Sequence, residues 1–192
     1  MIRTLVLLAV STLGWARAAD PLKVCCTVPD LASLVREVGG DQVSVTIFSK
    51  GTEDPHFLEA KPRFLKALSQ ADILVYVGME LEAGYLPLLV QNARNTRVLP
   101  GAPGHVDASA AIKALDLPTG SIDRSMGDVH PLGNPHYLVD PLRGLQVAAL
   151  LRDRLGAARP ESKAVFESRY EAFRTRLGKA LVGETLFEKY PA

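Results

Sequence analysis

Histidine is the residue type in this 192-residue sequence whose placement most clearly indicates chemistry. His56 follows Asp54-Pro55, and His136 follows Asn134-Pro135. Because a proline ring fixes the backbone angle φ immediately before each imidazole, both histidines lie on stiff Pro-His elbows. Neutral imidazoles bind zinc at about 2.0–2.1 Å, and they bind manganese when carboxylates assist. The two elbows together predict a divalent-metal site, whereas a single loop histidine is usually just solvated.

The other two histidines have weaker settings. His130 lies six residues before His136, and Gly133 between them would let the loop fold back so that both rings reach one ion. His130 is therefore a third candidate ligand. The alternative is a histidine that only orders the loop or supports a ligand from behind. His105 follows Gly104 without a matching elbow, and we interpret it as a surface loop residue.

Carboxylates near these segments have simpler interpretations than metal binding. Asp54 is expected to stabilise a turn, and Asp140, directly before Pro141, is expected to cap a helix. Glu80 and Glu82 could form a catalytic pair of carboxylates. An exposed loop following the strand that precedes them explains both residues equally well.

The composition excludes several other classes of protein. Hydrophobic residues make up 47% and charged residues 22% of the chain, as in ordinary globular proteins. A formal net charge of +1 gives no electrostatic reason to bind nucleic acid or an anionic membrane. Gly-x-Ser-x-Gly, phosphate-loop and His-Glu-x-x-His motifs are not found. Cys25 and Cys26 are adjacent and would point to opposite faces of a strand, so we expect at least one to be buried and inert rather than a thiolate ligand.

The first nineteen residues have the pattern of a secretory signal peptide. Arg3 precedes an apolar run from Leu5 to Trp15, and Ala16-Arg17-Ala18 provides a small-residue cleavage site. The apolar run is shorter than the ~20 residues of a membrane-spanning helix. A buried first helix is the alternative. A lipid anchor would need a cysteine at the cleavage point, and Cys25 lies beyond it. We therefore predict a periplasmic protein.

Strands and helices alternate along the following part of the chain. Apolar residues with helical spacing predict helices from Leu31 to Val38, with Asp30 as the N-cap, from Pro62 to Leu68 and from Tyr85 to Asn92. This alternation predicts an α/β fold with a mainly parallel four-stranded sheet flanked by helices, in which ligands bind at the carboxyl ends of the strands. The predicted strands are Lys23–Val28, Val43–Ile47, Ile73–Val77 and Thr96–Leu99.

Beyond residue 100 the pattern changes. Residues 100–135 are rich in Gly and Pro, which predicts a long functional loop, and a helix is expected from Pro141 to Leu155. A long C-terminal helix should follow, whose apolar stripe must pack on the lobe or on another chain; self-association is therefore a prediction. The stripe contains Phe166, Tyr170, Phe173, Leu177 and Leu181.

Several segments resemble the cluster A-1 (zinc/manganese) solute-binding proteins of ABC importers. Val24–Asp41 (VCCTVPDLASLVREVGGD) is similar to the first strand and helix of that family. Glu53–Lys61 (EDPHFLEAK), followed by Ala71–Glu82 (ADILVYVGMELE), is similar to its first metal-ligand block. Asn134–Pro141 (NPHYLVDP) resembles the second ligand block, and the similarity extends from about Leu22 to Tyr190.

The resemblance implies two α/β lobes joined by one long helix, with the metal held between the lobes. It assigns the ligand role to His56 and His136 and makes Ser162–Leu181 the connecting helix. The family's third histidine and final carboxylate lie in a second lobe beyond that helix, which this chain does not reach. The expected organisation is a signal peptide (1–19), an N-terminal metal-binding lobe (20–158) and a connecting helix (159–192).

The expected function is capture of zinc, or manganese, outside the cytoplasm for delivery to a membrane ABC permease. Such a binder performs no catalysis, and its affinity should fall as imidazoles protonate near their ordinary pKa of about 6.5. One alternative is a degenerate fragment without high metal affinity. Another is a small zinc-dependent hydrolase with Glu53 or Asp128 as general base, which is less favoured because catalytic zinc usually has three protein ligands.

Overall fold

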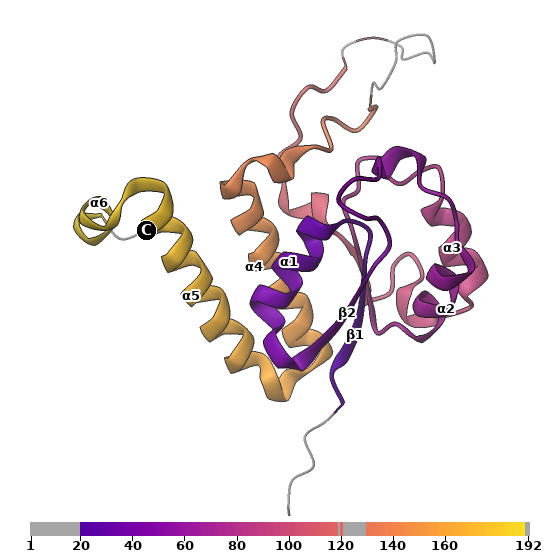
Figure 1. The fold of residues 1–192 in the computed structure, drawn as a ribbon, viewed down its shortest axis with the longest axis horizontal. Helices are drawn as coiled ribbons and strands as arrows, with labels where there is room; N and C mark the ends of the chain where they lie inside the picture. The colour runs from indigo at the N-terminus through magenta and orange to yellow at the C-terminus, as the bar shows by residue number, and fades with distance from the viewer. Residues whose placement is uncertain (1–19, 119, 121–129, 191–192) are drawn as a thin grey trace, which may run out of the picture.

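Four strands of the described chain form a parallel central sheet with helices on both faces (Figure 1). The computed structural model describes residues 20–118, 120 and 130–190. The predicted signal peptide (1–19) and Asp128 lie outside these residues. The sheet order is β2-β1-β3-β4, which confirms the predicted mainly parallel α/β architecture. The strands are β1 (Leu22–Cys26), β2 (Val43–Ile47), β3 (Ile73–Tyr76) and β4 (His105–Asp107).

Apolar side chains of the strands are buried on both faces of the sheet. Val24 of β1 pairs with Val45 of β2 on one side and with Ile73 of β3 on the other. Cys25 and Cys26 are both buried and belong to opposite core layers, as their adjacent strand positions predict. Burial raises the pKa of the Cys25 thiol to about 12, because the apolar interior disfavours a thiolate. Both thiols therefore lie in the apolar core, which confirms that at least one of them is buried.

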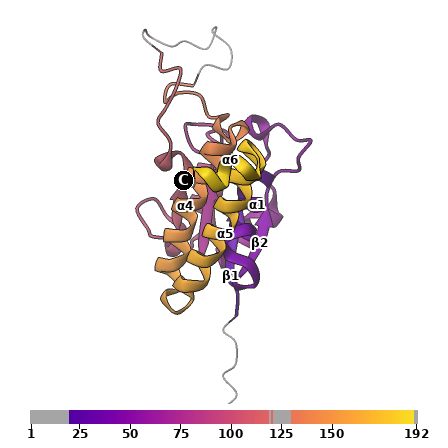
Figure 2. The ribbon, with the colours of Figure 1, turned by 90° about the vertical axis from the view of Figure 1, so that its left-hand side faces the viewer.

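One helical layer consists of α1 (Pro29–Gly39), α4 (Pro141–Ala158) and α5 (Lys163–Val182), which pack against one another (Figures 1 and 2). Helix α1 begins earlier than predicted, because Pro29 occupies its first turn and Val28, not Asp30, is the N-cap. The charge of Asp30 instead complements the helix dipole within the first turn.

The other layer consists of α2 (Pro62–Gln70) and α3 (Leu86–Ala93), close to their predicted positions. Phe64 of α2 is buried against Phe48, and their rings stack with centroids 4.8 Å apart. This second core anchors the start of the loop that leads from β2 to His56.

The predicted strand Thr96–Leu99 is wrong. Thr96–Val98 forms a 3₁₀ turn because the Asn95 side chain accepts a hydrogen bond from the Arg97 backbone N–H. The Asn95 amide also donates to carbonyls at the end of α2, which holds this turn against the helix. Local side-chain bonding of this kind competes with strand formation, although Val98 is fully buried as a strand residue would be.

The fourth strand instead begins at His105. It follows a turn in which a Cβ on Gly104 would lie 2.3 Å from the Asp72 carbonyl oxygen, so only glycine fits there. His105 therefore belongs to edge strand β4. Its side chain is half-buried, and its Nδ1 lies 2.8 Å from the Val98 carbonyl oxygen. The interpretation of His105 as a surface loop residue is wrong for this reason.

The first half of α5 packs back on the lobe. Phe166 is fully buried and Tyr170 nearly so, in the core formed with α1 and α4. Exposed apolar side chains lie further along, at Leu181 and Val182 and at Leu186 of α6 (Glu184–Lys189). The predicted stripe is therefore covered in its first half, and self-association through its end remains a prediction. Among the described helices, none is both long and apolar enough to cross a membrane.

Candidate metal centre

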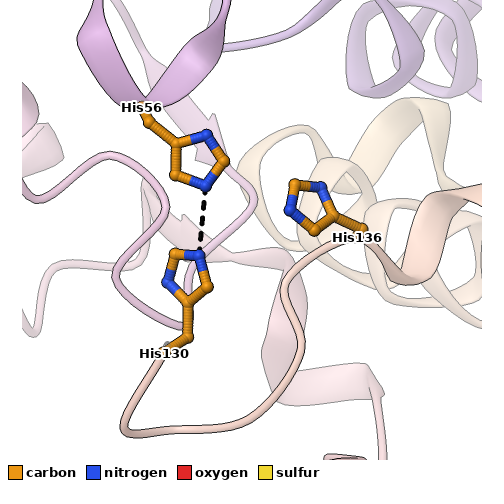
Figure 3. A group of neighbouring side chains, drawn as sticks. All are labelled: His56, His130 and His136. Carbon is orange, nitrogen blue, oxygen red and sulfur yellow. Dashed lines mark hydrogen bonds between the residues drawn. The ribbon is translucent and has the colours of Figure 1, made fainter. Parts of the chain in front are cut away.

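Three of the four histidines meet at the carboxyl edge of the sheet (Figure 3). One nitrogen from each of His56, His130 and His136 lies within 4.8 Å of the other two. Nε2 of His56 is 3.1 Å from Nε2 of His130, and the rings of His56 and His136 have centroids 5.3 Å apart. The ring of His56 comes from a segment far in sequence from the loop that carries His130 and His136, and the three rings surround one small space.

The first elbow is held by its own aspartate. The 3₁₀ turn Pro55–Phe57 starts at Asp54, whose Oδ1 accepts the backbone N–H of His56 at 2.9 Å. The same oxygen lies 2.7 Å from Nδ1 of His56. These hydrogen bonds, first from the backbone and then from the ring, hold the pKa of Asp54 below its usual range. Asp54 therefore has the predicted turn role and also orients the ring so that Nε2 faces the other histidines.

The second elbow uses asparagine in the same backbone role. Asn134 Oδ1 accepts the backbone N–H of His136 at 2.9 Å, with no contact to its ring among the described hydrogen bonds. Tyr137, the next residue, is buried and donates its hydroxyl proton to the Val77 carbonyl oxygen at 2.6 Å. Asp140 caps α4 by accepting the Leu142 N–H, as predicted.

The loop that carries His130 folds back as the glycine at position 133 predicts. Gly133 has φ +103°, and a Cβ there would lie 2.7 Å from the Leu115 carbonyl oxygen. That oxygen accepts the Asn134 N–H at 2.9 Å. The loop is therefore fastened to the segment after β4, and His130 and His136 both reach His56.

The three imidazoles fit a transition-metal ion. Bonds of about 2.0–2.1 Å in a tetrahedral zinc site place ligand nitrogens about 3.3–3.4 Å apart. The 3.1 Å separation of the His56 and His130 nitrogens is already close to this value. A shift of about 1–2 Å at the widest pair brings all three to tetrahedral spacing, with a fourth position left for another ligand.

Nearby carboxylates are engaged elsewhere. Glu53 accepts hydrogen bonds from the Lys50 backbone N–H and, at 3.2 Å, from the Lys61 ammonium group, which together lower its pKa. Glu80 is exposed, but Glu82 is only 3% exposed, so an exposed loop does not account for it. Burial raises the pKa of Glu82, and hydrogen bonds to its carboxylate oppose that rise. Sequence reasoning did not reveal that Glu82 and Tyr137 are buried and hydrogen-bonded at the ends of the strands.

Large apolar side chains close in sequence to the three histidines are exposed; we call Phe57, Leu132, Val139 and Leu142 the apolar rim. Phe57 is 75% exposed beside His56, and Val139 is 88% exposed on the turn that follows His136. Leu132 and Leu142 are also exposed. His105 lies apart from the cluster, lining a cavity of about 640 Å³ between α3 and β4.

Residues 24–181 match the sequence profile of ZnuA, the periplasmic component A of a zinc-uptake complex. The chain belongs to this family. The manganese ABC transporter substrate-binding lipoprotein PsaA of Streptococcus pneumoniae is 27% identical over 165 residues, 84% of this chain and 50% of the relative. The iron ABC transporter substrate-binding lipoprotein MtsA of Streptococcus pyogenes serotype M1 is 27% identical over 177 residues, 90% of this chain and 54% of the relative.

Solved structures share the fold. A crystal structure of ZnuA has a TM-score of 0.66 at 23% identity, covering 83% of this chain and 56% of that one. Zn(II)-bound AdcA from Streptococcus pneumoniae has a TM-score of 0.62 at 22% identity, covering 82% and 30%. This ZnuA-family chain thus spans about half the length of the curated relatives it matches. Those relatives are named as substrate-binding proteins of metal transporters, not as enzymes.

Proposed function

We propose that this chain binds zinc through His56, His130 and His136, as the metal-capturing component of an ABC importer. The ion is cargo, held by neutral imidazoles and passed on to a membrane permease. Convergence of the three imidazoles, one from the loop after β2 and two from the loop before α4, is the observation that supports this proposal. Membership of a family of substrate-binding proteins supports the transport role.

Zinc is favoured over manganese by the chemistry of the candidate ligands. The cluster offers three nitrogens, while the carboxylates beside it bond to protein groups. Imidazole suits zinc, whereas manganese prefers carboxylate and water ligands, and binding generally follows Mn²⁺ < Zn²⁺. Relatives named for manganese and for iron show that the family alone does not choose the metal.

Calorimetric titration with zinc tests the proposal. The expected result is sub-micromolar 1:1 binding that weakens more than about 100-fold in His56→Ala and His136→Ala, because losing a ligand costs more than losing a group behind it. His130→Ala should also weaken binding by more than about 100-fold, whereas a histidine that only orders the loop predicts a loss of about 10–100-fold. His105→Ala is the matched control, since this histidine lies outside the cluster.

Heat of mixing no larger than that of buffer would refute the binder and favour a degenerate fragment. A wild-type affinity for Mn²⁺ equal to that for zinc would refute the choice of metal. The described residues do not support the hydrolase alternative. Its candidate general base Glu53 instead accepts hydrogen bonds from Lys50 and Lys61. Zinc-dependent turnover of a panel of esters and peptides would revive it.

The domain division and location belong to the same proposal. Residues 1–19 act as a signal peptide that sends the chain to the periplasm. Residues 20–158 form the metal-binding lobe, and residues 159–192 form the connecting segment, whose long helix is α5 and in which α6 follows. The apolar rim then suits a second protein surface that closes over the ion and completes its coordination, because burying the rim would exclude water from the bound metal. N-terminal sequencing of exported protein, expected to begin near Ala19, tests the location.

A further inference from the structure

A buried carboxylate joins the ends of the two central strands at the carboxyl edge of the sheet. Glu82 accepts the Thr27 hydroxyl proton at 2.7 Å and the backbone N–H groups of Val77 and Gly78 at 2.8 and 3.1 Å. Thr27 follows β1 and Val77 follows β3. Three hydrogen bonds to one buried carboxylate leave its side chain little freedom, so it fixes these two strand ends relative to each other.

One arm of hydrogen bonds leads from Glu82 towards His56. The Thr27 carbonyl oxygen accepts both the backbone N–H and the hydroxyl proton of Ser49, at 3.1 and 2.8 Å. Ser49 starts the loop that carries His56. The far end of this loop meets the turn that contains Glu82, where a Cβ on Gly84 would lie 3.3 Å from the His56 carbonyl oxygen. Both ends of the loop are thus held by this turn and its partners.

A second arm leads from Glu82 towards His136. Val77 donates its N–H to Glu82, while its carbonyl oxygen accepts the Tyr137 hydroxyl proton at 2.6 Å. Tyr137 is only 8% exposed and directly follows His136. The peptide groups on either side of Val77 therefore connect the buried carboxylate to the second elbow.

We propose that Glu82 is the positioning residue of the metal centre, setting the separation of His56 and His136 through these two arms. This inference rests on the proposed zinc function. Metal sites accept ligand distances only within about 0.2 Å, so fixing two loops from separate strands raises affinity without contact with the ion. A stabilising role for Glu82 in the fold alone would change the melting temperature but not the zinc affinity of folded protein.

Each arm can be broken by removing one hydroxyl group. Tyr137→Phe removes the donor to Val77, and its matched control is Tyr85→Phe, because the buried Tyr85 hydroxyl has no hydrogen-bond partner within the described part of the chain. Thr27→Val removes the donor to Glu82 while keeping the shape of the side chain, and Thr27→Ser restores the hydroxyl as a rescue variant.

Two measurements distinguish positioning from stability. Zinc affinity is measured by chelator competition well below each variant's melting temperature. Nuclear Overhauser contacts between the ring protons of His56 and His136, whose centroids are 5.3 Å apart, are measured in metal-free protein. We expect Tyr137→Phe and Thr27→Val each to weaken zinc binding about 2- to 10-fold, the value of one hydrogen bond, and to weaken the ring contact. Tyr85→Phe should behave as wild type, and Thr27→Ser should recover most of the loss.

Unchanged zinc affinity and ring contacts in both arm variants would overturn the positioning role, even if their melting temperatures fall. Equal losses in Tyr85→Phe would overturn it too, since that hydroxyl lies outside both arms. A wild-type protein that binds no zinc would refute the proposed function. The ring contact in metal-free variants would then still decide whether Glu82 positions the histidines.

Discussion

Replacing Asp54 should weaken zinc binding while leaving the protein folded. Its Oδ1 lies 2.7 Å from Nδ1 of His56, which favours the proton on Nδ1 and the metal-binding lone pair on Nε2. Hydrogen bonds from His56 lower the pKa of Asp54, so it stays ionised at neutral pH. Changing such a group behind a metal ligand costs about 10–100-fold in affinity.

The exposure of Asp54 sets the size of the effect. Its side chain is 55% exposed, so water can replace part of the lost hydrogen bond, and Asp54→Ala should cost about 10-fold, the lower end of that range. Asp54→Asn makes the first elbow Asn-Pro-His, like the second. It keeps the oxygen acceptor and loses the charge, so a loss of about threefold is expected, because charge-assisted hydrogen bonds are about twice as strong as neutral ones.

Chelator competition at neutral pH measures these affinities, and thermal melting checks the fold. Asn134→Ala is the matched control, because Asn134 makes the same backbone hydrogen bond to His136 without touching its ring. Asp54→Ala should lose more affinity than Asn134→Ala. Equal losses would show that the elbow backbone, not ring orientation, controls binding, and wild-type affinity in Asp54→Ala would refute the reasoning altogether.

Three further predictions concern the fold and its surfaces. Phe166→Ala should lower the free energy of unfolding by about 3–5 kcal/mol in urea titration, because its ring is fully buried, whereas exposed Val165→Ala should change it by less than about 0.5 kcal/mol. Cys25 and Cys26 should react with iodoacetamide only after unfolding, since burial raises the pKa of both thiols; rapid alkylation of native protein would contradict this. If the end of the last helices mediates self-association, sedimentation should depend on concentration in wild type and not in Leu186→Glu; a wild-type monomer at all concentrations would refute it.

Sequence signals that act within a few neighbouring residues were sufficient to predict the fold class and the two Pro-His elbows. A short β-compatible run, an apolar-polar alternation and a continuous apolar run predicted the first, second and third strands, respectively. Pro-His pairs marked His56 and His136. All these signals act over a few neighbouring residues. The fourth strand was misplaced since Asn95 captures the backbone of Thr96–Val98, although the apolar pattern there suits a strand. The short strand at His105 has little apolar pattern of its own to reveal it.

Long-range contacts decided the rest of the site. Gly133 permits the loop to fold back. Only the packing of this loop against Leu115 brings Nε2 of His130 to 3.1 Å from Nε2 of His56. The position of Glu82 in the turn after β3 does not distinguish an exposed carboxylate from a buried one. Its burial depends on the ends of β1 and β3, which are distant in sequence and both donate hydrogen bonds to it. The sequence by itself therefore determined the fold class and which histidines are presented rigidly. The tertiary structure alone decided which of them meet and which buried groups hold them, because each of those contacts joins segments that sequence spacing cannot relate.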